Sequence, residues 1–313
     1  MSELHFREIP DERLREILSQ LSLGLERTTD FGMHLLKWFA EVDSSERHRI
    51  VFMMLLRQFL ELLDAISILV RQSSIDPCKP VLRSMFEIFL SFEYMLQEDT
   101  KKRANAFVVA YIYSVLRDYR KADPSTAEGK EHIRKIMSNQ KFPVSSSPTN
   151  PDWATNIQML ETELALPDYE ETRKEYISLQ AKTHGYPRWY SLYDGPRSIE
   201  QLAARVKLSA LYESHYRVWS GPLHGTDVFA NKSSPIGQGK VGVVQIRYVK
   251  DAQLVCANAF TIALGLFRTF VDALLPEYQG QLKSWFQTMF EYGAIVNGPD
   301  FINVIVEPPS SGS

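Results

Sequence analysis

Apolar residues recur at intervals of three and four positions along most of this chain, and that spacing lines one face of an α-helix. Leu14, Leu18 and Leu21 show it first, directly after Asp11, a residue type that commonly begins a helix. A chain with this pattern is largely restricted to a helical fold. Helices are predicted over about residues 11–21, 29–42, 46–72, 80–97, 101–121, 153–164, 168–183, 198–220, 251–275 and 277–292.

Strand signals are confined to two short segments. VGVVQIRYV at 241–249 is the best strand candidate, because it is apolar and rich in β-branched residues, and INVIV at 302–306 is its only plausible partner. The predicted fold class is therefore an all-α helical bundle with a minor β-hairpin or short strand pair near the C-terminal third.

The composition changes once along the chain. Residues 123–152 are polar, and PVSSSPTNP at 143–151 has three prolines and three serines in nine residues, which is typical of a loop. We expect an N-terminal helical segment (1–44), a helical bundle domain (45–275) with 123–152 as an inserted loop, and a C-terminal helix and tail (276–313).

The net charge limits the classes of binding partner, and the cysteines indicate the redox compartment. A net charge of −3 and a pI near 6.2 argue against a broad nucleic-acid-binding surface, although a local basic pocket stays open. The only two cysteines form neither a metal-ligand spacing nor a disulfide framework, and the lack of a disulfide framework favours a reducing compartment. Val51–Val70 is interrupted by charges, and Ala252–Phe267 is uncharged for only sixteen residues, so both are expected as core helices rather than membrane spans. With a charged N-terminus that lacks an apolar signal region, a cytoplasmic location and no membrane contact are expected.

The common sequence motifs of enzymes and of nucleotide or metal sites are absent from the sequence. There is no Walker A loop, Gly-rich dinucleotide motif, HExxH, CxxC or GxSxG. No metal and no cofactor are therefore predicted. Acid/base catalysis stays open, because it needs only a few placed polar groups.

HYRVWSGPLHG at 215–225 is the segment most suggestive of chemistry. Arg217 and His224 are seven positions apart, which is about 700° on a helix, so their side chains would share a face if the helix continued past Pro222. Arginine can hold a phosphate and histidine can transfer a proton near neutral pH, so together they suffice for attack of a ribose 2′-hydroxyl on its phosphate. The alternative is a structural histidine that caps a helix end.

Two further groups of residues are candidates. Arg83 and Glu87 lie at i,i+4 in a helix that is apolar nearly all round, so they are expected to be buried, either as a structural ion pair or as the floor of a polar pocket. Trp189 and Tyr190 belong to an aromatic loop that could stack on bases, or could simply anchor the loop on the core.

These segments together resemble an uncharacterised, mainly bacterial helical family, a domain of unknown function with the number 5677. That family has a leucine–arginine–x3–glutamate helix, then a tryptophan–tyrosine stretch, then a tyrosine, a serine and a histidine–glycine ending. The resemblance covers roughly residues 45–275 and falls on Arg83, Glu87, Trp189, Tyr190, Tyr216, Ser220 and His224.

The spacing from Arg217 to His224 also resembles the Arg–x4–6–His signature of the HEPN superfamily. This resemblance implies a metal-independent endoribonuclease of a stress or anti-phage defence system that acts as a homodimer. Arg217 and His224 would be catalytic, and Tyr216, Ser220, Arg83 and Glu87 would position the substrate. RNA would be the substrate, and an operon-encoded protein is a candidate partner. The alternative is a non-catalytic interaction or sensor subunit in which the same polar residues are structural.

Overall fold

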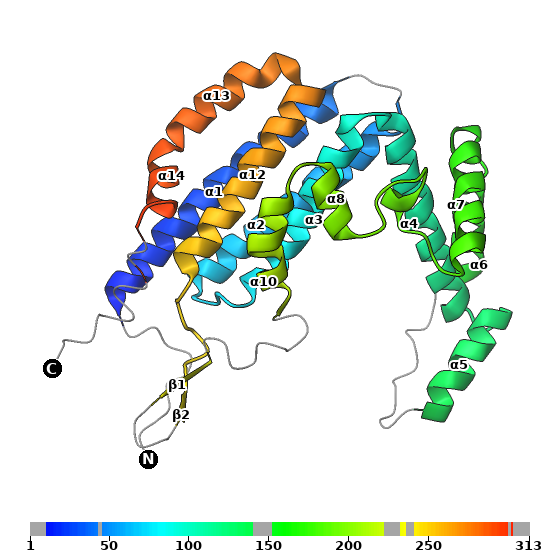
Figure 1. Cartoon of the computed structure of the whole chain (residues 1–313), viewed down its shortest axis with the longest axis horizontal. Coiled ribbons are helices and arrows are strands. Elements are labelled where there is room, and N and C mark those ends of the chain that lie inside the picture. The colour runs from blue at the N-terminus through cyan, green and yellow to red at the C-terminus, as the bar shows by residue number, and fades with distance from the viewer. Residues whose placement is uncertain are drawn as a thin grey trace. The chain divides into compact units, whose positions relative to one another are not determined.

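The computed structural model is dominated by helices, and it describes residues 11–42, 46–139, 152–221, 232–235, 241–299 and 302 (Figure 1). The all-α class predicted from the sequence is confirmed. The chain divides into two compact units, one made of 1–97 with 203–313 and the other of 98–202. The ranges expected as domains from the sequence do not coincide with this division.

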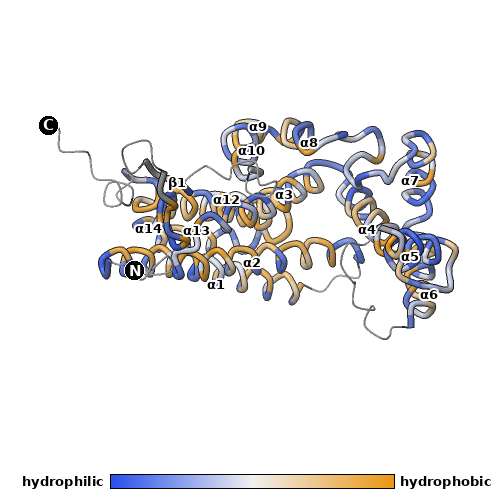
Figure 2. The backbone as a smooth tube through the Cα atoms, turned by 90° about the horizontal axis from the view of Figure 1, so that it is seen from below, coloured by the Kyte–Doolittle hydropathy of each residue, from blue (hydrophilic) through white to orange (hydrophobic). Residues whose placement is uncertain are grey.

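Four long helices form the core of the first unit. They are α1 (Glu12–Glu41), α2 (Arg49–Arg71), α3 (Cys78–Gln97) and α12 (Ala252–Leu274). α1 packs on α2 and α12, and α3 packs on α2 and α12. Apolar residues, in orange, run along α1, α2 and α12 in Figure 2. This core provides the rigid helix α3 that carries Arg83 and Glu87.

The first helix is longer than expected. The sequence predicted separate helices over about 11–21 and 29–42, but one helix of 30 residues spans both. The intervening residues contain no proline, and the Thr28 hydroxyl donates to the Gly24 carbonyl oxygen at 2.8 Å, a bond that an α-helix accommodates. The prediction of a break was therefore wrong.

The segment after residue 198 is more broken than expected. The prediction of one helix over 198–220 is wrong: α8 (Ile199–Arg205), α9 (Ser209–Leu211), the π-helix η3 (Tyr212–Tyr216) and α10 (Arg217–Trp219) follow one another. Ser198 does cap α8, since its hydroxyl accepts from the Gln201 amide at 3.1 Å. Lys207 then adopts a left-handed conformation, with φ of 62°, and interrupts the helical path.

Of the strand predicted over 241–249, only Val241–Val243 forms a strand. Val241–Val243 (β2) pairs in antiparallel fashion with Ser233–Pro235 (β1), and Ile302 is helical. The predicted partner segment 302–306 otherwise lies outside the described residues. Within the described residues, the predicted pairing of 241–249 with 302–306 is not seen.

The C-terminal helices complete the first unit. They are the 3-10 turn η4 (Pro276–Tyr278), α13 (Gln279–Thr288) and α14 (Phe290–Val296), in place of the single helix predicted over 277–292. By length and composition, α12 is the one helix in the described part of the chain that could cross a membrane, and 67% of its most apolar window is buried. That burial fits the core helix predicted from the sequence.

The second unit is built on α4 (Thr100–Ala122). Around it lie α5 (Ala127–Asn139), α6 (Trp153–Leu164), the 3-10 turn η1 (Pro167–Tyr169), α7 (Glu170–Thr183) and the 3-10 turn η2 (Trp189–Ser191). Its own core includes Tyr176, which stacks on Tyr113 with ring centroids 4.4 Å apart. The inserted loop predicted over 123–152 is partly wrong, because α5 occupies 127–139, and 140–151 lie outside the described residues.

Candidate functional site

Arg83 and Glu87 form an ion pair one turn apart on α3. The Arg83 Nε atom donates to the Glu87 Oε1 atom at 3.1 Å. The four-residue spacing brings the two side chains together on one face of the helix, as the sequence predicted.

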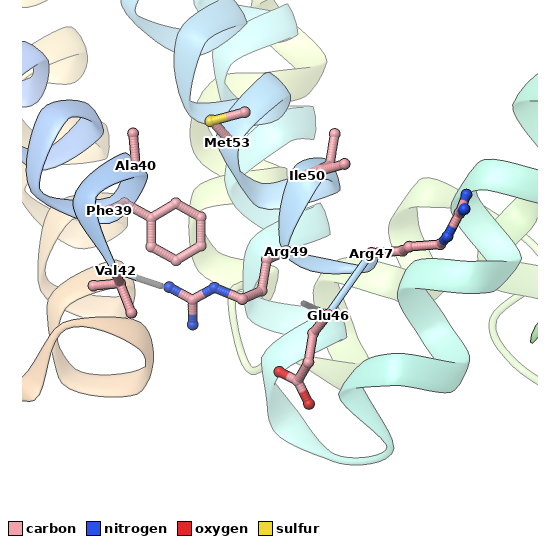
Figure 3. A pocket seen from close by; sticks show the side chains of 8 residues that line it. All are labelled: Phe39, Ala40, Val42, Glu46, Arg47, Arg49, Ile50 and Met53. Atoms are coloured by element: carbon pink, nitrogen blue, oxygen red, sulfur yellow. The ribbon is translucent and has the colours of Figure 1, made fainter. Parts of the chain in front are cut away.

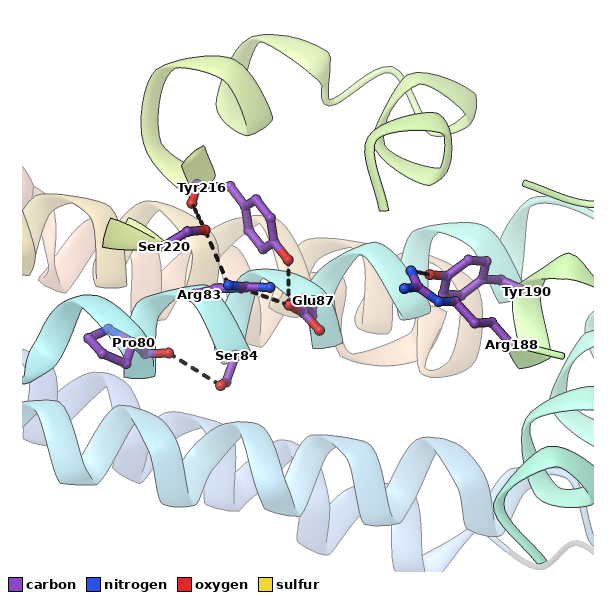
Figure 4. Close-up of polar contacts among 8 residues, drawn as sticks. All are labelled: Pro80, Arg83, Ser84, Glu87, Arg188, Tyr190, Tyr216 and Ser220. Atoms are coloured by element: carbon purple, nitrogen blue, oxygen red, sulfur yellow. Dashed lines mark hydrogen bonds and ion pairs between the residues drawn. The ribbon is translucent and has the colours of Figure 1, made fainter. Parts of the chain in front are cut away.

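Two residues of the segment after α9 join this pair. The Tyr216 hydroxyl donates to the same Glu87 Oε1 atom at 2.6 Å, and the Arg83 Nη1 atom donates to the Ser220 Oγ atom at 3.2 Å (Figure 4). Ser220 in turn donates to the Tyr216 carbonyl oxygen at 2.9 Å. The Arg83 guanidinium also lies over the Tyr216 ring, 4.7 Å from its centroid. We call these four residues the Arg83 network.

The network is only partly buried, so the prediction of a buried pair was wrong. The Arg83 side chain is 24% exposed and the Glu87 side chain 39% exposed. α3 presents them on a face that the segment around Tyr216 covers incompletely. Burial and the hydrogen bond to Glu87 raise the pKa of Tyr216 above its usual range, so this hydroxyl stays protonated and acts as a donor.

Aromatic packing fixes the position of the segment that carries Tyr216. The Phe86 ring on α3 lies 5.8 Å from the Tyr216 ring and 6.4 Å from the Trp219 ring, between centroids. Both Tyr216 and Trp219 are buried. The backbone of Tyr212–Tyr216 is a π-helix, a rare turn that often occurs at functional sites. Neither Phe86 nor Trp219 was predicted as a site residue, because an aromatic side chain was the only signal that the sequence offers for them.

Arg217 does not belong to the network. Its side chain is 63% exposed, and its Nη1 atom pairs with the Glu213 Oε2 atom at 2.8 Å, one turn earlier. His224, its predicted catalytic partner, lies outside the described residues. The predicted pairing of Arg217 with His224 therefore stays a prediction.

The aromatic loop residues Trp189 and Tyr190 belong to the second unit. Tyr190 is buried, and its hydroxyl accepts from the Arg188 Nη1 atom at 2.6 Å. Trp189 packs edge-on against Phe107 of α4, with centroids 5.4 Å apart. These contacts are those of a loop anchored on its core, which is the alternative that the sequence left open.

Two pockets lie away from the Arg83 network. One, of about 190 Å³, lies between the end of α1 and the start of α2 (Figure 3) and is lined by Phe39, Ala40, Val42, Glu46, Arg47, Arg49, Ile50 and Met53. The other, of about 500 Å³, lies in the second unit, where Lys101 and Lys102 pair with Asp168 and Glu171. Neither pocket is lined by a residue that the sequence singled out. Among the described residues, no group of three or more His, Cys, Asp or Glu side chains could hold a metal ion.

The fold and the site together define a helical protein. In it, the Arg83 network joins the core helix α3 to the segment that contains the π-helix Tyr212–Tyr216. The model of a family described as "Family of unknown function (DUF5677)" matches residues 49–233, and the chain belongs to this family. The matched region contains all four residues of the Arg83 network. No curated protein and no solved structure matches the chain.

Proposed function

We propose that this protein is a metal-independent endoribonuclease of the HEPN type that acts in the cytoplasm in stress response or anti-phage defence. His224 would be the general acid/base for attack of a ribose 2′-hydroxyl on the adjacent phosphate, and an arginine cation would stabilise the charge that develops on the phosphate. The Arg–x6–His spacing makes Arg217 the candidate for this arginine. The products would be a 2′,3′-cyclic phosphate and a 5′-hydroxyl.

The observation that carries the proposal is the convergence of Arg83, Glu87, Tyr216 and Ser220 in one network, in which the Arg83 and Glu87 side chains are partly exposed. Arginine and serine are donors suited to a phosphate. Ser220 is followed four positions later in the sequence by His224, so the network lies next to the predicted acid/base along the chain. A fixed donor group beside a histidine is what a metal-independent cleavage of RNA requires.

Two partners belong to the same proposal. A homodimer would bring two copies of the motif together, and an operon-encoded protein would control the activity. Arg217 and Val218 are both exposed on α10, with 62% exposure for Val218, which is compatible with a contact to a second copy.

The test is cleavage of total RNA by the purified protein in EDTA. The wild type should cut RNA without added metal and leave 2′,3′-cyclic phosphate ends, and His224→Ala should be inactive. General acid/base catalysis contributes about 10²–10⁴-fold in rate, so the loss would be plain on a gel. His132→Ala, which changes an exposed histidine on α5, is the matched control. Intact RNA with the wild type, or equal cleavage by His224→Ala, would contradict the proposal.

The second candidate is a non-catalytic interaction or sensor subunit. It is favoured by one observation: each residue of the Arg83 network already bonds another member of the network. In that case the four residues would hold the segment around Tyr216 on α3 and bind no substrate. His224→Ala would then lower the melting temperature, and the wild type would have no RNA-cleaving activity to lose.

A further inference from the structure

Arg83 is held in place from three directions. Its Nε atom is fixed by Glu87, its Nη1 atom by Ser220, and its guanidinium plane by the Tyr216 ring. These two hydrogen bonds use two of the five N–H donors of the guanidinium, and the side chain is 24% exposed. A guanidinium fixed in this way loses little side-chain entropy when it binds an anion.

The Arg217 side chain is much more exposed than that of Arg83. Its side chain is 63% exposed and pairs with Glu213, which lies in the same helical path and is itself 51% exposed. An exposed pair of this kind contributes little energy, and fixing both long side chains costs conformational entropy. Moving Arg217 onto a phosphate would also leave the Glu213 carboxylate without this partner.

From this contrast, and resting on the proposed ribonuclease function, we infer that Arg83 rather than Arg217 is the cation that contacts the scissile phosphate, with the Ser220 hydroxyl beside it. Glu87 and Tyr216 are then positioning residues, because they hold the guanidinium without touching the substrate. Ser220 can turn its hydroxyl from the Tyr216 carbonyl to an oxygen of the phosphate, since a hydroxyl rotates freely.

The charge of the network also selects the type of phosphate. Arg83 and Glu87 together carry no net charge, and the Glu87 carboxylate lies within hydrogen-bond distance of the cation. A phosphodiester inside an RNA chain has one negative charge, whereas a terminal phosphate has nearly two at neutral pH. The second charge would meet repulsion from Glu87. The site therefore suits an internal phosphodiester rather than a terminal phosphate.

The experiment measures binding separately from cleavage. A labelled single-stranded RNA with 2′-O-methyl groups cannot be cut through the 2′-hydroxyl, so fluorescence anisotropy reports its affinity alone. Arg83→Lys should weaken binding at least tenfold, because a point charge cannot reproduce the fixed fork, and it should weaken binding more than Arg217→Lys does. Arg57→Lys, which changes an exposed arginine paired with Glu61 on α2, is the control and should change binding less than twofold. Ser220→Ala is a second, milder variant and should weaken binding about threefold. Circular dichroism verifies that each variant is folded.

Competition with small ligands tests the selectivity. A dinucleotide with one internal phosphodiester should displace the labelled RNA at a lower concentration than a nucleoside monophosphate does. The inference is overturned if the wild type does not bind, if Arg217→Lys loses affinity while Arg83→Lys keeps it, or if the monophosphate competes better. Arg83-dependent binding without any cleavage of ordinary RNA would keep Arg83 as the contact to an RNA phosphate but reject the proposed ribonuclease, and with it the claim that this phosphate is the scissile one. Cleavage of RNA combined with unchanged binding by Arg83→Lys would support the proposed ribonuclease and reject the inference.

Discussion

Glu87 and Tyr216 are 129 residues apart in the sequence, and the Tyr216 hydroxyl donates a hydrogen bond of 2.6 Å to the Glu87 Oε1 atom. The same oxygen accepts from the Arg83 Nε atom. One carboxylate oxygen thus joins the core helix α3 to the segment that leads toward His224. Changing this carboxylate should affect both the position of Arg83 and the stability of the segment.

Glu87→Ala should lower the free energy of unfolding by about 1–3 kcal/mol, because it removes a charged acceptor from two donors. The partial exposure of Glu87 places the expected value below the cost of breaking a fully buried pair. Glu87→Gln keeps the shape and one acceptor, so it should cost less than half as much. Urea denaturation followed by circular dichroism gives both values, and equal effects of the two variants would contradict this role of the carboxylate.

Gly32 marks a close approach of α1 to α2 and α12. A Cβ atom at this position would lie 2.2 Å from the Leu60 Cδ2 atom and 2.8 Å from the Phe267 Cζ atom. Gly32→Ala should therefore destabilise the protein by about 1–3 kcal/mol through overpacking. Gly280→Ala in α13 is the matched control, because nothing lies within 4 Å of its added Cβ, and it should stabilise by about 0.5 kcal/mol. Thermal unfolding checks the pair, and equal shifts of the melting temperature would refute the close contact.

The sequence was a good guide where local spacing decides the structure. The helix predicted over 153–164 is α6, with the Asp152 side chain accepting from the Thr155 amide at its start. The ion pair of Arg83 with Glu87 followed from their four-residue spacing on one helix. Both features depend only on neighbours along the chain, so periodicity and capping rules predict them.

Features that depend on distant residues were missed. The strand β1 consists of Ser233, Ser234 and Pro235, which have no strand pattern, so its pairing with β2 could not be predicted. The break at Lys207 gave no signal, because lysine favours helices and only its left-handed backbone marks the interruption. The hydrogen bond of Tyr216 to Glu87 could not be predicted either, because no local rule links positions so far apart.

Arg49 should be replaceable by methionine. Its guanidinium lies 4.1 Å from the centroid of the Phe39 ring, and its Nη2 atom is the one buried side-chain nitrogen or oxygen without a hydrogen-bond partner in the described part of the chain (Figure 3). An unpaired buried donor costs about 1–3 kcal/mol, and the contact with an aromatic ring returns about 0.5–1 kcal/mol or more. Arg49→Met keeps apolar contact with Phe39, so it should leave the free energy of unfolding unchanged or raise it by about 1 kcal/mol.

The control for this prediction is Arg49→Ala, which removes the packing along with the charge and should be less stable than Arg49→Met. Urea denaturation compares both variants with the wild type. If Arg49→Met is destabilised by more than about 1 kcal/mol, the guanidinium makes a favourable interaction that outweighs its buried, unpaired nitrogen.

The last prediction concerns pH and His215, the residue directly before Tyr216. Burial lowers the pKa of His215 below its usual value of 6.5, so the folded protein keeps this ring neutral at a pH where the unfolded chain has begun to protonate it. As the pH falls from about 7 to about 5, the unfolded state binds the proton first, and the free energy of unfolding decreases. Above the unfolded pKa neither state binds the proton, and the effect of His215 vanishes.

His215→Gln removes the titration and should flatten this part of the stability profile, measured by urea denaturation at each pH. If the wild type and His215→Gln lose stability equally between pH 7 and pH 5, the shifted histidine is not the cause.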